Sequence, residues 1–164
     1  MPRPPLLCYV EVKNNGTTIF DFSLIIVHLK AYSGIENEMK RRISCNKLKE
    51  FIDTQLLTEE EKDIIILGDW NDEVDDLPEE NIFSQFIEDS LDYKILTAVI
   101  DNQYSYISTD SLYDSLIDHI LITHDAMDEY GNGHIYVLYL DREFSQYTEY
   151  ISDHRPVLAR FFCF

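Results

Sequence analysis

The stretch Ile64-Ile65-Ile66-Leu67-Gly68-Asp69-Trp70-Asn71-Asp72 decides the fold class of this chain. Its β-branched start predicts a buried strand over residues 63–67, because such side chains pack well on both faces of a pleated sheet. Gly68 ends the apolar run, and polar side chains follow at once. The segment therefore predicts an interior strand that carries carboxylate and amide groups to one edge of a sheet.

A hairpin is predicted before this strand, with strands over Leu6–Val12 and Thr17–Leu29. Asn14-Asn15-Gly16 joins them, and Asn and Gly tolerate the positive φ of a tight turn. The second strand becomes continuously apolar over Leu24–Val27, which is typical of a strand covered on both faces.

A long helix is predicted over Ile35–Leu57, between the hairpin and the central strand. Its apolar residues recur at helical spacing as one stripe that should face the core, and its basic residues fall mostly elsewhere. The predicted stripe comprises Met39, Ile43, Leu48, Phe51, Ile52 and Leu56, and the basic residues are Lys40, Arg41, Arg42, Lys47 and Lys49.

The rest of the chain predicts a short helix near Ile82–Ile87 and strands over Ile117–Thr123, His134–Leu140 and Pro156–Cys163. No repeat or linker interrupts the pattern, so residues 1–164 are expected to form one domain. Hairpins combined with a crossover helix predict a layered α/β (α+β) fold in which helices cover the sheets.

The net charge of −18 is concentrated in one part of the chain. Residues 1–62 carry nine acidic and nine basic side chains, whereas residues 63–141 carry 19 acidic side chains against one base, Lys94. Such a surface repels nucleic acid unless cations intervene. The acidic region is either a solvated face or the surroundings of a cation-rich site.

The cysteine content and the N-terminal sequence favour an intracellular, cytoplasmic protein. Cys8, Cys45 and Cys163 are odd in number and lack metal-ligand spacing, which predicts buried thiols in a reducing compartment. The start, Met1-Pro2-Arg3-Pro4-Pro5, lacks the apolar region of a signal peptide. No apolar run approaches the roughly 20 residues of a membrane-spanning helix.

Polar residues follow or interrupt the apolar strands at four places. They are His28 after Leu24–Val27, Asp69 with Asn71 after the central strand, Asp118 inside a strand, and Asp153-His154 before the last strand. A carboxylate inside an apolar strand is costly unless it is paired or bound to a metal. Carboxylates at one sheet edge suit a hard cation, and histidines there suit a phosphate.

Each of these residues also has a structural explanation when it is taken alone. His28 could be a satisfied core histidine, Asp69 with Asn71 an Asx turn, and Asp118 the partner of an arginine. An EF-hand calcium loop is a further alternative, although its sixth position would be Val74 where the motif requires glycine. Its oxygen ligands would be Asp69, Asn71, Glu73, Asp75 and Glu80.

Taken in order, the motifs resemble the endonuclease/exonuclease/phosphatase superfamily, whose fold is that of deoxyribonuclease I. The resemblance spans roughly residues 3–162. The matching segments are Val27-His28-Leu29-Lys30-Ala31, the basic helix with Arg41-Arg42, Ile66-Leu67-Gly68-Asp69-Trp70-Asn71, Ser115-Leu116-Ile117-Asp118-His119-Ile120-Leu121 and Ser152-Asp153-His154-Arg155-Pro156-Val157.

The resemblance implies a four-layer α/β/β/α sandwich and hydrolysis of a phosphate ester by in-line attack of water. Asp69 would position or activate that water, His28 would donate to the phosphate, and Asn71 would hold a phosphate oxygen or assist at the metal. His154 would contact the phosphate or act as acid and base, oriented by Asp118. Asp153, with Asp69 and Asn71, would bind Mg²⁺ or Mn²⁺.

The same resemblance implies that residues 1–164 correspond to the C-terminal portion of the domain, without its N-terminal half. That half supplies an asparagine and a metal-binding glutamate for which this sequence has no matching motif. The chain is therefore expected to associate with itself or with an N-terminal half. A non-catalytic binding module, a degenerate half-domain, is the alternative function. The class of phosphate ester stays open, with nucleic acid disfavoured by the net charge.

Overall fold

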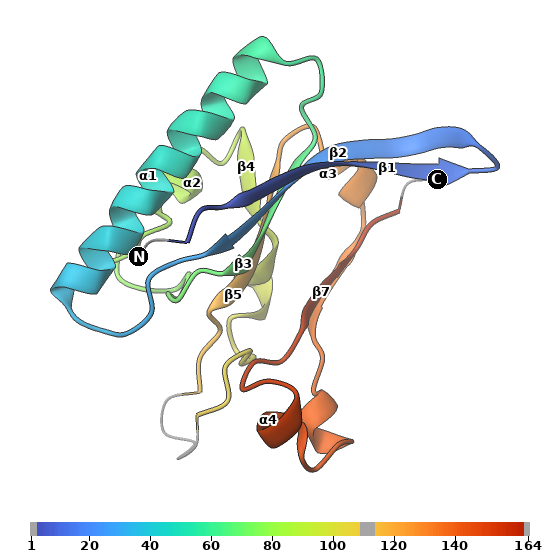
Figure 1. Ribbon diagram of the computed structural model, residues 1–164. Helices are drawn as coiled ribbons and strands as arrows, with labels where there is room; N and C mark the ends of the chain where they lie inside the picture. The colour runs from blue at the N-terminus through green and yellow to red at the C-terminus, as the bar shows by residue number, and fades with distance from the viewer. Residues whose placement is uncertain (1–2, 109–113, 163–164) are drawn as a thin grey trace.

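The computed structural model describes residues 3–108 and 114–162. A five-stranded sheet of order β1-β2-β3-β5-β4 carries the long helix α1 (Ile35–Thr58) on one face (Figure 1). A two-stranded sheet of β6 and β7 packs on the other face. The strands are β1 (Leu6–Asn14), β2 (Thr17–His28), β3 (Ile64–Asp69), β4 (Tyr93–Ile95), β5 (Asp118–Thr123), β6 (His134–Val137) and β7 (Val157–Arg160).

The predicted order of elements is confirmed from the hairpin to the last strand. Strands β1 and β2 pair antiparallel around a turn in which Asn15 and Gly16 have φ of 50° and 84°. Strand β3 pairs parallel with β2, and α1 makes the crossover between them. Strand β7 begins one residue after the predicted start at Pro156, and the predicted end at Cys163 lies outside the described residues.

The shorter helical elements connect these strands. They are α2 (Ser84–Glu88), η1 (Leu96–Ile100), α3 (Met127–Tyr130), η2 (Leu140–Arg142) and α4 (Tyr147–Tyr150). Strand β4 and the elements η1, α3, η2 and α4 are too short to give a periodic pattern, so they were not predicted from the sequence. Among the described residues, none of the helices is both long enough and apolar enough to cross a membrane.

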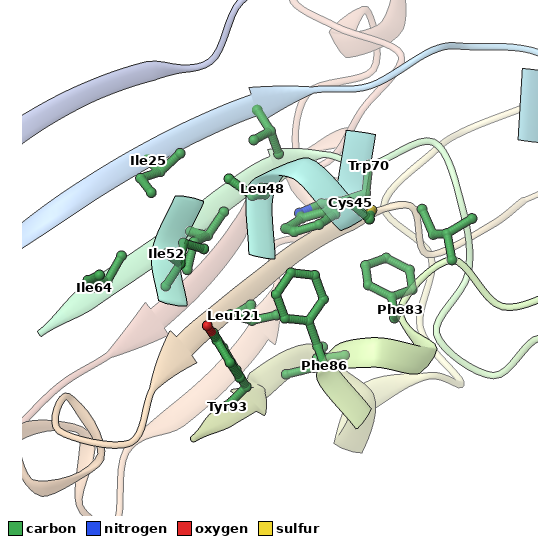
Figure 2. Close-up of a cluster of buried hydrophobic side chains, with 14 residues drawn as sticks. Ile25, Cys45, Leu48, Ile52, Ile64, Trp70, Phe83, Phe86, Tyr93 and Leu121 are labelled. Carbon is green, nitrogen blue, oxygen red and sulfur yellow. The ribbon is translucent and has the colours of Figure 1, made fainter. Parts of the chain in front are cut away.

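The core beneath α1 is built around Trp70, which is fully buried between α1 and the sheet (Figure 2). The predicted apolar stripe of α1 is wrong in part, because Met39, Ile43 and Phe51 are 57%, 49% and 41% exposed. The buried face of α1 is instead formed by Arg41, Cys45, Leu48 and Ile52. Leu56 packs partly against this core, as the pattern indicated.

The prediction of buried thiols is confirmed at Cys45. Its side chain has no solvent exposure, and burial raises the pKa of the Cys45 thiol far above its usual range. Cys8, on β1, is half-buried, and both cysteines are free. Cys163 lies outside the described residues. The reducing compartment stays a prediction.

A second core lies between the two sheets. Its buried residues come from β3, β5, β6, η1 and the loops around them, and Phe20 extends it onto β2. The chain thus forms α, β and β layers. An outer helical layer over β6 and β7 is not formed by the described residues, whose helices in that region, α3, η2 and α4, have four, three and four residues.

The face of β1 and β2 that points toward the second core is only partly covered. The prediction that β2 is covered on both faces is wrong at Ile26, which is 37% exposed, and its neighbour Leu6 is 59% exposed. Exposed apolar residues beside an edge strand promote association. They are consistent with the expectation that the chain pairs with itself or with an N-terminal half, which stays a prediction.

Gly68 is required where β3 passes β2. Its φ is +141°, and a Cβ placed there would lie 2.0 Å from the backbone oxygen of Val27. We expect Gly68→Ala to lower the free energy of unfolding by roughly 2–4 kcal/mol, because strain and a backbone clash combine. Gly16→Ala is the control, since its φ is +84° and nothing lies within 4 Å. Equal losses in urea denaturation would contradict this account.

Two acidic side chains with raised pKa values should make the folded chain more stable in mild acid than at neutral pH. Burial and neighbouring carboxylates raise the pKa of Asp63 and the pKa of Asp76 to about 7 each. The folded chain then binds more protons than the unfolded chain between about pH 4 and 7, so stability falls as the pH rises through that window.

Thermal melts at pH 5 and pH 8 measure this dependence. We expect a higher midpoint at pH 5 and a smaller difference between the two midpoints in Asp63→Asn. The exposed Asp101→Asn is the matched control. A midpoint that rises from pH 5 to pH 8 would contradict the prediction.

Candidate active site

Strand register brings three of the predicted site residues to one edge of the sheet. His28 pairs with Asp69 across β2 and β3, and Asp69 pairs with Asp118 across β3 and β5. Nε2 of His28 lies 3.4 Å from Oδ2 of Asp69. Residues that end or begin three adjacent strands therefore form one row of polar side chains on a sheet edge.

His154 joins this row from the segment before β7. Its Nδ1 lies 2.7 Å from Oδ2 of Asp118, which is the predicted hydrogen bond between the two residues. This bond and the negative charge of Asp118 raise the pKa of His154 above its ordinary value, against the opposing effect of burial. The bond also fixes the tautomer of a neutral His154, so that the proton lies on Nδ1 and Nε2 is an acceptor.

Asp69 both shapes the turn after β3 and carries a perturbed carboxyl group. Its Oδ1 accepts the backbone N–H of Asn71 at 2.9 Å, so the Asx turn considered from sequence is present. Burial, followed by the charge of Asp118, raises the pKa of Asp69. A half-buried carboxyl group whose pKa is raised beside another carboxylate is typical of functional sites.

Asn71 and Asp153 lie at the margins of the cluster. Asn71 has a positive φ of 55°, and its side-chain amide donates to the backbone oxygen of Leu29 at 3.4 Å. Asp153 is exposed and adds negative charge near His154. In the part of the chain that the structure describes, no group of three or more His, Cys, Asp or Glu side chains is arranged to hold a metal ion. The EF-hand alternative therefore gains no support.

A buried ion pair holds the loop that follows β3. Nε of Arg41, on α1, lies 2.8 Å from Oδ2 of Asp72, and both side chains are less than a tenth exposed. Arg41 also donates to the backbone oxygens of Lys30 and Tyr32 in the loop after β2. The basic helix, which was not predicted to belong to the site, thus ties together the two loops that follow His28 and Asp69.

His119, adjacent to Asp118 in β5, has a structural role. Its ring is buried, with Nδ1 2.7 Å from Oγ1 of Thr97 and Nε2 2.9 Å from the backbone oxygen of Asp72. Burial lowers the pKa of His119 to about 4. His119 is therefore neutral at physiological pH and helps to fix the same loop.

The structure adds three residues that the sequence patterns missed. Arg3 contacts Nε2 of His28 with its guanidinium group, and the ring of Tyr106 lies 5.4 Å from the ring of His154. Oγ of the buried Ser105 accepts the backbone N–H groups of Ile117 and Asp118. An arginine before a strand could have been noticed as a charge near His28, whereas Tyr106 and Ser105 lie in a loop without any local signal.

No protein-family model matches this sequence, and a search of curated proteins gives no significant match. Solved structures do match. The human Nocturnin catalytic domain, solved with a sulfate anion, is 20% identical with a TM-score of 0.58, over 96% of this chain and 52% of that chain. The Neisseria 3′ phosphatase NExo, solved with a product DNA hairpin, is 20% identical with a TM-score of 0.62, over 85% of this chain and 61% of that chain.

A third match is an endonuclease/exonuclease/phosphatase family protein from Bacteroides thetaiotaomicron. It is 16% identical with a TM-score of 0.56, over 97% of this chain and 55% of that chain. The chain thus spans about half to three fifths of the solved chains that it resembles. Over that span, it has the deoxyribonuclease I-like fold of the endonuclease/exonuclease/phosphatase superfamily, as its motifs predicted.

Proposed function

We propose that this cluster hydrolyses phosphate esters by in-line attack of water, with Mg²⁺ or Mn²⁺ bound. The observation that carries the proposal is the 2.7 Å contact between Asp118 and His154, placed directly beside Asp69. A histidine oriented by one carboxylate next to a second, perturbed carboxylate is a common arrangement of acid–base groups. The likeness of the fold to that of a Neisseria 3′ phosphatase supports the same reaction class.

Each residue of the cluster would have its own role in the reaction. Asp69, the carboxylate at the centre of the row, holds the attacking water and accepts its proton. His154 meets the phosphate with Nε2, and its raised pKa favours the protonated form. This form stabilises negative charge and would give its proton to the alcohol oxygen that departs as the P–O ester bond breaks. His28 and Arg3 lie at the other side of Asp69 and would donate to phosphate oxygens. Asn71 would hold a further phosphate oxygen.

A hard divalent cation fits the donor chemistry of this edge. Mg²⁺ is commonly bound by one or two carboxylates and completes its shell with water and substrate phosphate oxygens. Asp69 and Asp153, with the amide oxygen of Asn71, would be the protein ligands. A cation there would offset the repulsion between the carboxylates of Asp69 and Asp118. The bound cation would also neutralise part of the negative charge of the phosphate.

Hydrolysis of bis(4-nitrophenyl) phosphate tests the proposal. The release of nitrophenolate is measured with Mg²⁺, with Mn²⁺ and with EDTA. The chain is assayed alone and mixed with the portion of the Neisseria phosphatase that it does not cover. We expect hydrolysis that requires the metal and is lost in His154→Ala. Absence of metal-dependent hydrolysis both in the chain alone and in the mixture would favour the alternative, a non-catalytic binding module.

Metal binding by the chain alone is predicted to be weak. The described residues offer only a partial set of oxygen ligands, so most of the coordination shell would be water. Calorimetric titration with Mg²⁺ should give a dissociation constant in the millimolar range and no heat in Asp153→Ala. Tight binding that survives Asp153→Ala would contradict the assignment of Asp153 as a ligand.

A further inference from the structure

A cleft lies directly beside the candidate site. It has a volume of about 710 Å³ and is formed by residues 107–108 on one side and residues 148–153 on the other. The second wall begins in α4 and ends at Asp153, which precedes His154 in the sequence. A phosphate held by His154 would therefore have its esterified group at the mouth of this cleft.

Hydrogen bonds fix the walls of the cleft to the candidate site. The backbone N–H of Ile107 donates to the oxygen of Asp153 at 2.8 Å, and Tyr106 forms an antiparallel bridge with His154. The hydroxyl of the buried Tyr147 donates to the backbone oxygen of His154 at 2.9 Å. The cleft is therefore a fixed extension of the site.

The lining of the cleft has a distinct chemistry. Among the described residues, it contains two acidic side chains, Glu149 and Asp153, together with hydroxyl and apolar side chains, and no lysine or arginine. The nearest arginine in sequence, Arg155, is held by Asp141 through two contacts of 2.8 Å, from Nε to Oδ1 and from Nη2 to Oδ2. Because Asp153 would be held by the cation, the carboxylate of Glu149 is the charge that repels an anion in the cleft. The hydroxyl and apolar side chains offer an uncharged alcohol hydrogen-bond partners and apolar contacts.

We propose that the cleft binds the alcohol half of the phosphate ester and selects esters whose alcohol carries no negative charge. This inference rests on the proposed function, because it places the scissile phosphate at His154. A polynucleotide is disfavoured as a substrate, since its neighbouring phosphates would run past the carboxylate of Glu149. Small phosphate esters of neutral, hydroxyl-bearing alcohols are the expected class.

Two ligands that differ in one group test the selection. Glycerol 3-phosphate and 3-phosphoglycerate have nearly the same size, but the second carries a carboxylate where the first carries a hydroxymethyl group. Calorimetry on the full chain with Mg²⁺, with inorganic phosphate as the reference ligand, should show that glycerol 3-phosphate binds roughly tenfold more tightly than 3-phosphoglycerate, because unit charges near a surface repel by that order.

Glu149→Gln should reduce this preference at least threefold and leave the affinity for inorganic phosphate unchanged. Glu143→Gln is the matched control, because Glu143 is exposed and does not line the cleft. Equal affinities for the two ligands, or equal effects of the two variants, would overturn the inference while phosphate still binds. Failure of inorganic phosphate to bind at all would overturn the proposed function and this inference together.

Discussion

Replacement of Arg41 by alanine is expected to cost about 3–5 kcal/mol of folding free energy, the range for removing one partner of a buried ion pair. The guanidinium group of Arg41 is the charge that compensates the buried Asp72. Without it, Asp72 would keep an unpaired carboxylate next to Asp76, whose own pKa is already raised to about 7. The loops after β2 and β3 would lose their common anchor.

Urea denaturation of Arg41→Ala beside Lys40→Ala measures this effect. Lys40 makes an exposed pair with Glu36 at 2.6 Å, one turn away on the same helix, and such pairs contribute about 0.3–0.5 kcal/mol. Arg41→Ala should therefore lower the midpoint far more than Lys40→Ala. A loss below about 1 kcal/mol in Arg41→Ala would show that Asp72 finds another partner, and the assigned role of Arg41 would be wrong.

Replacement of Asp118 by asparagine is expected to slow metal-dependent hydrolysis by roughly 10²–10⁴-fold. The amide cannot stabilise a positive imidazole as the carboxylate does, and it can hold His154 in the wrong tautomer. Because the bond to Asp118 is the largest cause of the raised pKa of His154, this pKa should fall in the variant. The pH at which activity is lost through deprotonation of His154 should fall with it.

To check this prediction, the steady-state rate of hydrolysis is measured as a function of pH for Asp118→Asn and for Asp128→Asn. Asp128 is an exposed aspartate on α3, away from the row of site residues, so its replacement should leave both rate and profile unchanged. An unchanged rate and pH profile in Asp118→Asn would mean that its contact with His154 has no catalytic role.

The strands other than β4, and their order along the chain, could be predicted because each leaves a local pattern. Asn15-Gly16 allows only a few turn geometries, and the run Ile64–Leu67 has few alternatives to a buried strand. The placement of His28, Asp69 and Asp118 on one edge follows from the same patterns, since ends of adjacent strands meet there. Strand register then brings these side chains together.

The rotation of α1 could not be predicted from its apolar pattern. Arg41 lies on the buried face because Asp72, more than 30 residues later, satisfies its charge, and Met39 and Ile43 are turned outward as a result. A tertiary ion pair thus overrode hydrophobic periodicity. The partial exposure of Ile26 has a similar origin, because it depends on how much of the β1–β2 face the β6–β7 sheet covers.

In the site, too, the residues that lie in local patterns could be predicted, whereas those placed by tertiary contacts could not. His154 and Asp118 stand in motifs that resemble a known family, so their contact could be expected. Ser105 and Tyr106 reach the site through long-range contacts of a loop, and nothing in their immediate sequence marks them. Arg3 is marked only as a charge before a strand. A sequence pattern identifies groups on strand ends better than groups that the tertiary fold brings to them.

The most direct test of the central claim is a histidine NMR titration of the chain with inorganic phosphate in the presence of Mg²⁺. If the edge formed by His28, Asp69, Asp118 and His154 is a phosphate-ester site, the imidazole signals of His28 and His154 should shift together and saturate. The signal of His134, exposed on β6, should stay unchanged. Shifts of equal size in His134, or no shift in His28 and His154, would contradict the account.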